Sequence, residues 1–153
     1  MEEFRGMSIG GNFDEEKLVY HFITTELNCY KNWFGMDRAC TIFGIKKSDN
    51  LFVGRNYDWL PKTENLFQVY KFINPAKFSF VAITDGAYGA EAGYDRKNWF
   101  YNVDDAINDK GLFIGITFAY ADQWSWGISC VHMTKIIAET CATVKDAIKV
   151  FEK

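Results

Sequence analysis

The sequence lacks long apolar runs and clusters of basic residues. Its apolar runs stay well short of the roughly 20 residues that a membrane-spanning helix needs. Lysine and arginine are scattered and the formal net charge is -3, so no basic stripe indicates nucleic acid and no polybasic segment indicates a membrane surface. The N-terminus has neither the basic region nor the apolar core of a signal peptide. We therefore expect a cytoplasmic protein with no nucleic-acid and no membrane partner.

Cysteine and histidine are also few, and they are not spaced as ligands. The four cysteines, Cys29, Cys40, Cys130 and Cys141, form no Cys-x-x-Cys pair and no close Cys/His cluster. We expect no zinc site, no disulfide scaffold and no cofactor. Cys130 and Cys141 bracket a predicted helix and are expected to be buried. A Cys40–His132 dyad is the ordinary way to activate a thiol, although a lone histidine on a helix is more often structural.

Apolar and aromatic residues, by contrast, are abundant. The 153 residues are 48% hydrophobic and 18% aromatic, which is enough for the packed core of a single domain. No internal repeat or low-complexity linker divides the chain. Strand patterns come first and helix patterns follow, an order that indicates an α+β domain.

Periodicity and turn signals place the individual elements. We predict helices over residues 14–34 and 128–140 and from Thr143 onward, strands over 66–73, 77–83 and 112–118, and turns over 46–50 and 108–111. Thr143 is a candidate N-cap for the last helix.

The segment that carries candidate chemistry is a predicted hairpin. Two β-leaning runs, residues 41–45 and 51–54, are joined by a short polar segment. In an antiparallel hairpin the start of the first strand lies beside the end of the second, so Cys40 should lie near Arg55 and Asp58. A cationic arginine favours a thiolate, and a carboxylate can orient an adjacent amine or imidazole. The alternative is that Cys40 is a buried small residue while Arg55 and Asp58 pair with each other.

Three motifs in order resemble the choloylglycine hydrolase and penicillin V acylase family. They are Cys-Thr-Ile-Phe at 40–43, Leu-Phe-Val-Gly-Arg-Asn-Tyr-Asp-Trp at 51–59 and Asn-Asp-Lys-Gly-Leu at 108–112. Members of this family are N-terminal nucleophile hydrolases of the cysteine type. The resemblance implies hydrolysis of linear carbon–nitrogen amide bonds in acyl amides, such as bile-salt-like or penicillin V-like compounds, with acyl transfer as a close variant.

The same resemblance implies a catalytic role for each residue of the site. Autocleavage between Ala39 and Cys40 would free the α-amino group of Cys40 to act as general base. Cys40 would form a thioester with the acyl group, with Arg55 stabilising the thiolate and Asp58 orienting the α-ammonium. Thr117 stands where family members often carry an asparagine that donates to the oxyanion.

Aromatic residues after the hairpin are candidates for binding the apolar acyl group. We predict this substrate-binding role for Trp59, Tyr88 and Phe100, which belong to segments rich in glycine and aromatic residues. The alternative is that such residues only pack against the sheet.

The resemblance also implies how the chain is organised. It predicts the first half of an αββα four-layer sandwich with antiparallel sheets, in which residues 1–39 form a pro-segment or leading helix and residues 40–153 an incomplete hydrolase domain. We therefore expect a homo-oligomer or a missing C-terminal half, since a lone half would expose a sheet face or edge. The alternative function is a non-catalytic α+β binding or assembly module derived from a half domain.

Overall fold

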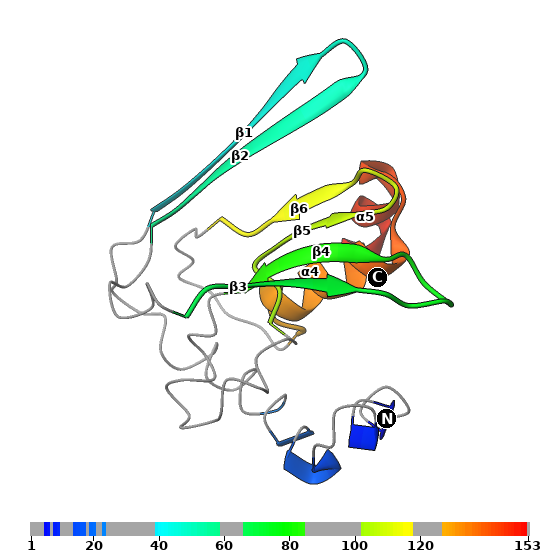
Figure 1. Cartoon of the computed structure of the whole chain (residues 1–153). Coiled ribbons are helices and arrows are strands. Elements are labelled where there is room, and N and C mark those ends of the chain that lie inside the picture. The colour runs from blue at the N-terminus through cyan, green and yellow to red at the C-terminus, as the bar shows by residue number, and fades with distance from the viewer. Residues whose placement is uncertain are drawn as a thin grey trace.

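The computed structural model describes residues 39–58, 66–84, 102–117 and 127–152, together with short stretches between residues 5 and 23. From residue 39 onward these ranges contain two antiparallel sheets and two helices that follow them (Figure 1). The predicted α+β class is therefore correct. Of the predicted helix over 14–34, most positions lie outside the described residues.

A long hairpin forms the first sheet. Strand β1 (Ala39–Lys47) pairs with β2 (Asn50–Asp58), and the last pair before the turn is Lys47 with Asn50. The turn is tighter than the predicted five-residue segment, because only two residues, Ser48 and Asp49, separate the strands. Ser48 has a φ of 54°, and a positive φ at the first turn position is a feature of two-residue hairpin loops.

The second sheet has four antiparallel strands in sequence order. They are β3 (Gln68–Phe72), β4 (Phe80–Thr84), β5 (Asp105–Asn108) and β6 (Phe113–Gly115). Burial alternates along β4, with Phe80, Ala82 and Thr84 buried and the residues between them exposed. This two-residue period shows that only one face of the sheet is covered by the described residues.

Two strand predictions need correction, and one strand was missed. The predicted strand over 112–118 shortens to the three residues of β6, and residues 77–79 lie outside β4. Lys77 belongs instead to a turn, in which its N–H donates to the Asn74 carbonyl at 3.3 Å. Strand β5 was not predicted, because its ends, Asp105 and Asn108, are residues typical of turns. Pairing with β4 and β6 overrides that local preference.

Two helices close the described chain. Helix α4 (Cys130–Thr140) begins two residues later than predicted, and α5 (Val144–Phe151) follows it. Thr143 is the N-cap of α5, as its sequence context predicted. Its hydroxyl accepts from the Asp146 N–H, and the Asp146 carboxylate accepts from the Thr143 N–H, which completes a capping box. None of the helices in the described residues is long and apolar enough to cross a membrane.

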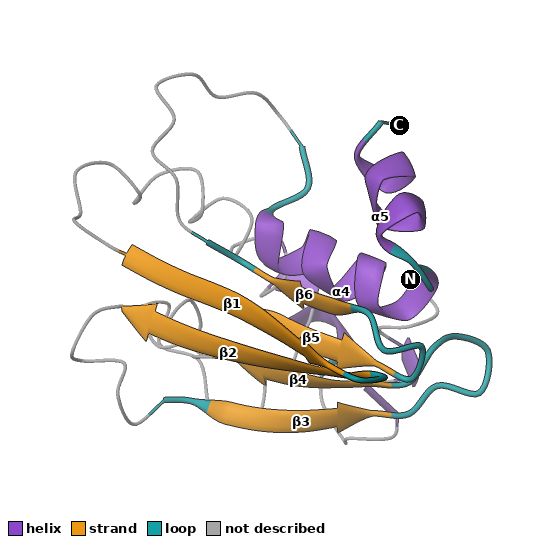
Figure 2. Ribbon diagram, turned by 90° about the horizontal axis from the view of Figure 1, so that it is seen from above, coloured by secondary structure: helices purple, strands orange, loops and turns teal. Residues whose placement is uncertain are grey.

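The sheet of β3–β6 separates the helices from the hairpin. Helix α4 packs on β5 and β6, and Ala106 of β5 shares a buried cluster with Ala138 of α4. Because side chains alternate along a strand, Asp105 and Ile107 point to the opposite face. Arg55 of β2 reaches Asp105 from that side. The hairpin and α4 therefore lie on opposite faces of the sheet, as Figure 2 shows from above.

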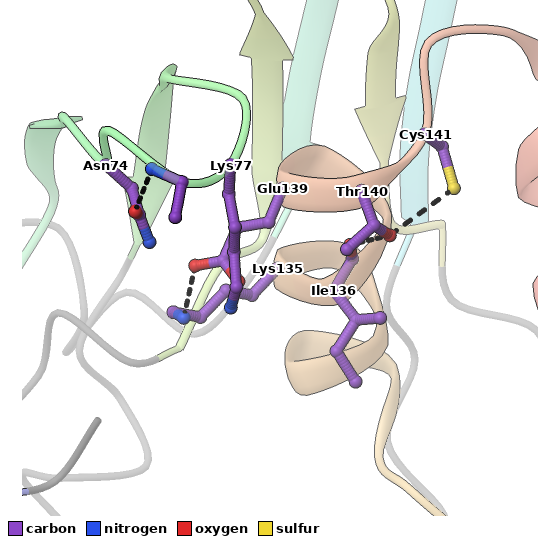
Figure 3. A network of polar contacts seen from close by, with 8 residues as sticks. Asn74, Lys77, Lys135, Ile136, Glu139, Thr140 and Cys141 are labelled. Carbon is purple, nitrogen blue, oxygen red and sulfur yellow. Dashed lines mark hydrogen bonds and ion pairs between the residues drawn. The ribbon is translucent and has the colours of Figure 1, made fainter. Parts of the chain in front are cut away.

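A buried carboxylate ties α4 to the turn between β3 and β4. Glu139 accepts from the Nζ of Lys135, one helical turn earlier, at 2.5 Å and from the Nζ of Lys77 at 2.6 Å (Figure 3). The Phe78 N–H also donates to the Glu139 carbonyl at 3.0 Å. Two lysines on one buried carboxylate satisfy its charge, which is the condition for keeping such a group inside a protein.

Asn108 joins the β5–β6 turn to the end of α4. Its Nδ2 donates to the carbonyls of Ala138 at 3.1 Å and Cys141 at 2.8 Å, while its Oδ1 accepts from the N–H groups of Lys110 and Leu112. The predicted turn over 108–111 is present, and its last residue is a glycine with a φ of 78°. One amide therefore satisfies two helix carbonyls and two turn donors at once.

Asn108→Ala is expected to lower the free energy of unfolding by at least about 2 kcal/mol, because it leaves buried carbonyls and an N–H without partners. Urea unfolding followed by circular dichroism measures the loss. Asp109→Ala, at the next and exposed position of the same turn, is the matched control and should cost less than about 1 kcal/mol. Equal losses in the two variants would contradict the role given to Asn108.

Candidate active site around Cys40 and Arg55

The register of the hairpin brings the candidate residues to one end of β1 and β2. Cys40 lies opposite Tyr57, Ala39 opposite Asp58, and Ile42 opposite Arg55. Cys40 is partly buried. Tyr57, the residue across from Cys40, is thus preceded by Arg55 two positions earlier and followed directly by Asp58. Both residues are therefore close to Cys40, as expected for a hairpin.

Arg55 is held by contacts from both sheets. Its Nε donates to both carboxylate oxygens of Asp105, at 2.9 Å to Oδ1 and 3.1 Å to Oδ2. Its Nη2 donates to the Ile116 carbonyl at 2.7 Å, and its Nη1 donates to the Asn56 carbonyl at 2.5 Å. The guanidinium carbon also lies 4.8 Å from the centre of the Tyr57 ring, a cation–π contact. All three nitrogens of the guanidinium are therefore engaged.

The alternative interpretation of the sequence, an ion pair between Arg55 and Asp58, is wrong. Arg55 pairs with Asp105 instead, and the two side chains are 10% and 5% exposed. Both carboxylate oxygens of Asp58 accept from the Nδ2 of Asn56 at 2.9 Å. Asp58 is exposed, so its carboxylate is positioned next to the chain that precedes Cys40 while remaining open to solvent.

The pKa values of the two paired groups show what the pairing costs. Burial lowers the pKa of Arg55, but hydrogen bonds to Cys40 and Asp105 and the attraction of both groups raise it above its ordinary value. Burial raises the pKa of Asp105, and the hydrogen bond and charge of Arg55, with the Ile116 N–H, offset this only in part. Arg55 therefore stays cationic beside Cys40, whereas the Asp105 carboxylate is held at a net cost.

Gly115 of β6 makes room for this carboxylate. A Cβ at this position would lie 2.6 Å from Oδ1 of Asp105 and 2.7 Å from Cδ1 of Ile42. Both distances are shorter than such contacts allow, so any larger residue would push away the Asp105 carboxylate and the end of the Ile42 side chain. The close approach of β1, β5 and β6 at this point depends on the missing side chain.

The structure describes only one of the other predicted site residues, Thr117. Thr117 follows Ile116 directly and is exposed, so it lies at the same end of the sheet as Arg55. The three aromatic residues predicted to bind substrate, Trp59, Tyr88 and Phe100, lie outside the described residues.

Helix α4 does not supply the expected alternative partner for the thiol. The Nδ1 of His132 is 3.2 Å from the hydroxyl of Ser129 at the start of α4, on the far side of the sheet from the hairpin. Cys141 is buried as expected, but the expectation for Cys130 was wrong. Cys130 is the first residue of α4 and is exposed, whereas Val131 and His132, which follow it in the same turn, are buried. The geometry therefore favours Arg55 over His132 as the partner of Cys40.

Sequence reasoning missed Asp105 and the Ile116 carbonyl. Asp105 lies three residues before the Asn108 motif, and the pattern of an acidic residue before Ala106 and Ile107 carried a weak strand signal. Nothing local indicates that this carboxylate meets an arginine 50 residues earlier. Within the described residues, no group of three or more His, Cys, Asp or Glu side chains gathers to hold a metal ion.

A comparison with known families places the chain. The model of the acyl-coenzyme A:6-aminopenicillanic acid acyl-transferase family matches residues 45–153. The chain belongs to this family. The family is part of the group of N-terminal nucleophile enzymes that includes choloylglycine hydrolases and penicillin acylases, so the resemblance seen in the sequence is confirmed at that level. The match includes Arg55 and Asp105 and begins after Cys40. No curated protein and no solved structure matches the chain.

Membership of this family supports an enzyme of the acyltransferase or amide hydrolase type. The contacts around Arg55 belong to the matched region, whereas the assignment of Cys40 depends on the hairpin register and on its contact with Arg55.

Asp105→Asn is expected to change how stability depends on pH. A carboxyl whose pKa is raised on folding binds more protons in the folded than in the unfolded chain, so its contribution to stability falls as pH rises between the two pKa values. The free energy of unfolding of the parent, relative to that of the variant, should therefore decrease as pH rises from about 4, the ordinary pKa of aspartate. Urea titrations over a pH series measure the difference. A difference that increases with pH would show that attraction to Arg55 outweighs burial.

Proposed function

We propose that the chain carries the nucleophile half of an N-terminal cysteine amidase of the acylase or acyltransferase type. The observation that supports this most directly is the largely buried Arg55, which Asp105 fixes two residues along β2 from Tyr57, the partner of Cys40, and whose pKa Cys40 helps to raise. The chain's membership of an acyl-transferase family supplies the reaction class. The substrates we propose are linear amides with an apolar acyl part, such as penicillin V-like or bile-salt-like compounds.

The proposed reaction begins after cleavage between Ala39 and Cys40. The freed α-amino group of Cys40 takes the thiol proton, and the sulfur attacks the amide carbon. Collapse of the tetrahedral intermediate breaks the carbon–nitrogen bond, and the leaving amine takes a proton from the α-ammonium. The resulting thioester is then attacked by water, which completes hydrolysis, or by another amine, which completes acyl transfer.

Two charged groups support this chemistry at opposite sides of Cys40. The Arg55 guanidinium stabilises the thiolate, because an adjacent fixed cation favours the charged form of a cysteine. Asp58 lies opposite Ala39, so it can accept a hydrogen bond from the α-ammonium that cleavage creates. Asn56 holds that carboxylate through both oxygens, which limits its rotation.

The remaining roles in the proposal are those predicted from the sequence. Thr117 donates to the oxyanion from the segment after β6, beside the carbonyl that binds Arg55. Trp59, Tyr88 and Phe100 contact the acyl group. Residues 1–39 form the segment that is removed.

We further propose that this fold is half of an αββα four-layer sandwich. The described part already has the order helix, sheet, hairpin. On the hairpin side of the sheet, large apolar residues are exposed, among them Val69, Val81, Ile83 and Ile107, and the hairpin exposes Phe43, Ile45, Leu51 and Phe52. A further layer, from a C-terminal half or from another copy, would bury these residues. The same exposed surface is what favours the alternative, a non-catalytic assembly module.

Expression of the chain should yield a product that begins at Cys40, and Cys40→Ala should abolish this cleavage, because the thiol is the only nucleophile that the mechanism uses. Intact mass and N-terminal sequencing measure the outcome. Cys130→Ala, which removes an exposed cysteine from α4, is the control and should be cleaved normally. A chain that remains uncut, and that hydrolyses no acyl amide, would favour the assembly module.

Arg55→Lys should reduce hydrolysis of penicillin V or of an N-acyl amino acid by about 10- to 150-fold. Lysine keeps the charge but cannot form the planar set of contacts, and one lost hydrogen bond to a charged group is worth about 1.5–3 kcal/mol. Steady-state rates of amine release measure the change. Lys47→Arg, at the exposed tip of the hairpin, is the control for a lysine–arginine exchange. Full activity in Arg55→Lys would contradict the role assigned to Arg55.

A further inference from the structure

Among the residues that the structure describes, the guanidinium of Arg55 has one carboxylate partner, Asp105, which comes from the other sheet. Among the described residues, the titratable groups that face it are Cys40 of β1, Tyr57 of β2 and Asp105 of β5. Asp105 is 4% exposed and holds Nε through both of its oxygens. It is therefore well placed to set the direction in which the guanidinium points.

The other contacts of Arg55 cannot fix the direction of its guanidinium by themselves. Nη1 donates to the carbonyl of Asn56, its own neighbour in β2, so that bond moves with the hairpin. Nη2 donates to the Ile116 carbonyl, a single acceptor that permits rotation about one bond. The bond from Nε to Asp105 adds a second fixed point on the other sheet. Together with the covalent bond to Cδ, two such contacts fix the plane of a guanidinium, whereas one does not.

The structure keeps the Asp105 carboxylate in a buried environment that disfavours its charged form. Burial disfavours the charged form of Asp105 more than Arg55 favours it, as its raised pKa shows. Gly115 is needed as well, because a side chain there would displace the carboxylate. Features that lower stability and are still built into the fold often serve the geometry of a site.

We propose that Asp105 is a positioning residue that holds the Arg55 guanidinium against the Cys40 thiol. The reactivity of Cys40 then depends on where the guanidinium is held and not only on its charge. This inference rests on the proposed role of Cys40 as nucleophile. It extends that proposal to a residue which does not itself touch the reacting atoms.

The test measures the reactivity of Cys40 without any substrate. The full chain is alkylated with iodoacetamide over a series of pH values, and the rate at each cysteine is followed by mass spectrometry of peptides. Cys130 is exposed and serves as a reference thiol in the same sample, while Cys141 is buried and reports loss of the fold. Neither autocleavage nor amide hydrolysis is needed for this readout.

Asp105→Asn should slow alkylation of Cys40 at neutral pH by about three- to tenfold and move its pH–rate profile to higher pH, because the guanidinium loses its fixed direction. The rate at Cys130 should not change. If Asp105 only neutralised Arg55, its removal would leave a stronger positive field at Cys40, and alkylation would become faster. Faster or unchanged alkylation would overturn the proposal.

A double-mutant cycle with Arg55→Gln shows whether Asp105 acts through Arg55. Asp105→Asn should have almost no further effect on Cys40 in the Arg55→Gln background, because there is no guanidinium left to position. Equal effects of Asp105→Asn in both backgrounds would also overturn the proposal. Asp105→Glu keeps the carboxylate and should restore part of the rate, and it serves as the working variant if Asp105→Asn fails to fold.

Gly115→Ala tests the same geometry with every charge retained. Its Cβ displaces the Asp105 carboxylate, so the rate at Cys40 should fall as in Asp105→Asn. Gly44→Ala, where a Cβ would make only an ordinary 3.6 Å contact with Leu51, is the matched control and should leave the rate unchanged. An unchanged rate in Gly115→Ala would contradict the positioning role.

The outcomes separate this inference from the proposed function. Alkylation of Cys40 that responds to Arg55→Gln but not to Asp105→Asn refutes the positioning role and leaves the nucleophile intact. Alkylation that resembles that of Cys130 and responds to neither variant refutes the assignment of Cys40 as an activated nucleophile, and the positioning role fails with it.

Discussion

The buried pair of Arg55 and Asp105 is the interaction on which the arrangement of this protein depends. It joins the hairpin to the four-stranded sheet, and it does so at the end where Cys40 lies. The pair is not a simple source of stability, because the raised pKa of Asp105 shows that burial disfavours the charged carboxylate, while the raised pKa of Arg55 shows that the pairing favours the cation. Its value is geometric, since it fixes a cation beside a thiol while main-chain carbonyls engage the other nitrogens.

Within the described residues, the two faces of the β3–β6 sheet are covered to different extents. On one face, α4 covers β5 and β6, and Asn108 and Glu139 connect the helix to neighbouring turns. On the other face the hairpin makes contact at the Arg55 end, and large apolar residues such as Val81 and Ile107 remain exposed. The face covered by α4 thus supports the sheet, while the other face carries the candidate site and exposed apolar side chains.

Much of the architecture followed from local patterns. Two β-leaning runs joined by a polar segment predicted the hairpin, Thr143 predicted the start of the last helix, and residues 108–111 predicted a turn, all of which the structure contains. Strand β5 escaped prediction because Asp105 and Asn108 have low intrinsic strand preference, and pairing on both sides overrides it. The burial of Cys130 was predicted wrongly because its place at the start of a helix does not show whether it faces the core, as its neighbours Val131 and His132 do.

The sequence by itself determined that Cys40 lies at the same end of the hairpin as Arg55 and Asp58. Both strands of a hairpin are contiguous in the chain, so a short turn sets the register of all the pairs that follow. Only the tertiary structure decided that Arg55 pairs with Asp105 and not with nearby Asp58. The two residues are 50 positions apart, and their contact requires the hairpin to pack on one face of a second sheet with a glycine at the crossing. Local periodicity carries no information on such packing, because it depends on how separate elements bury their faces together.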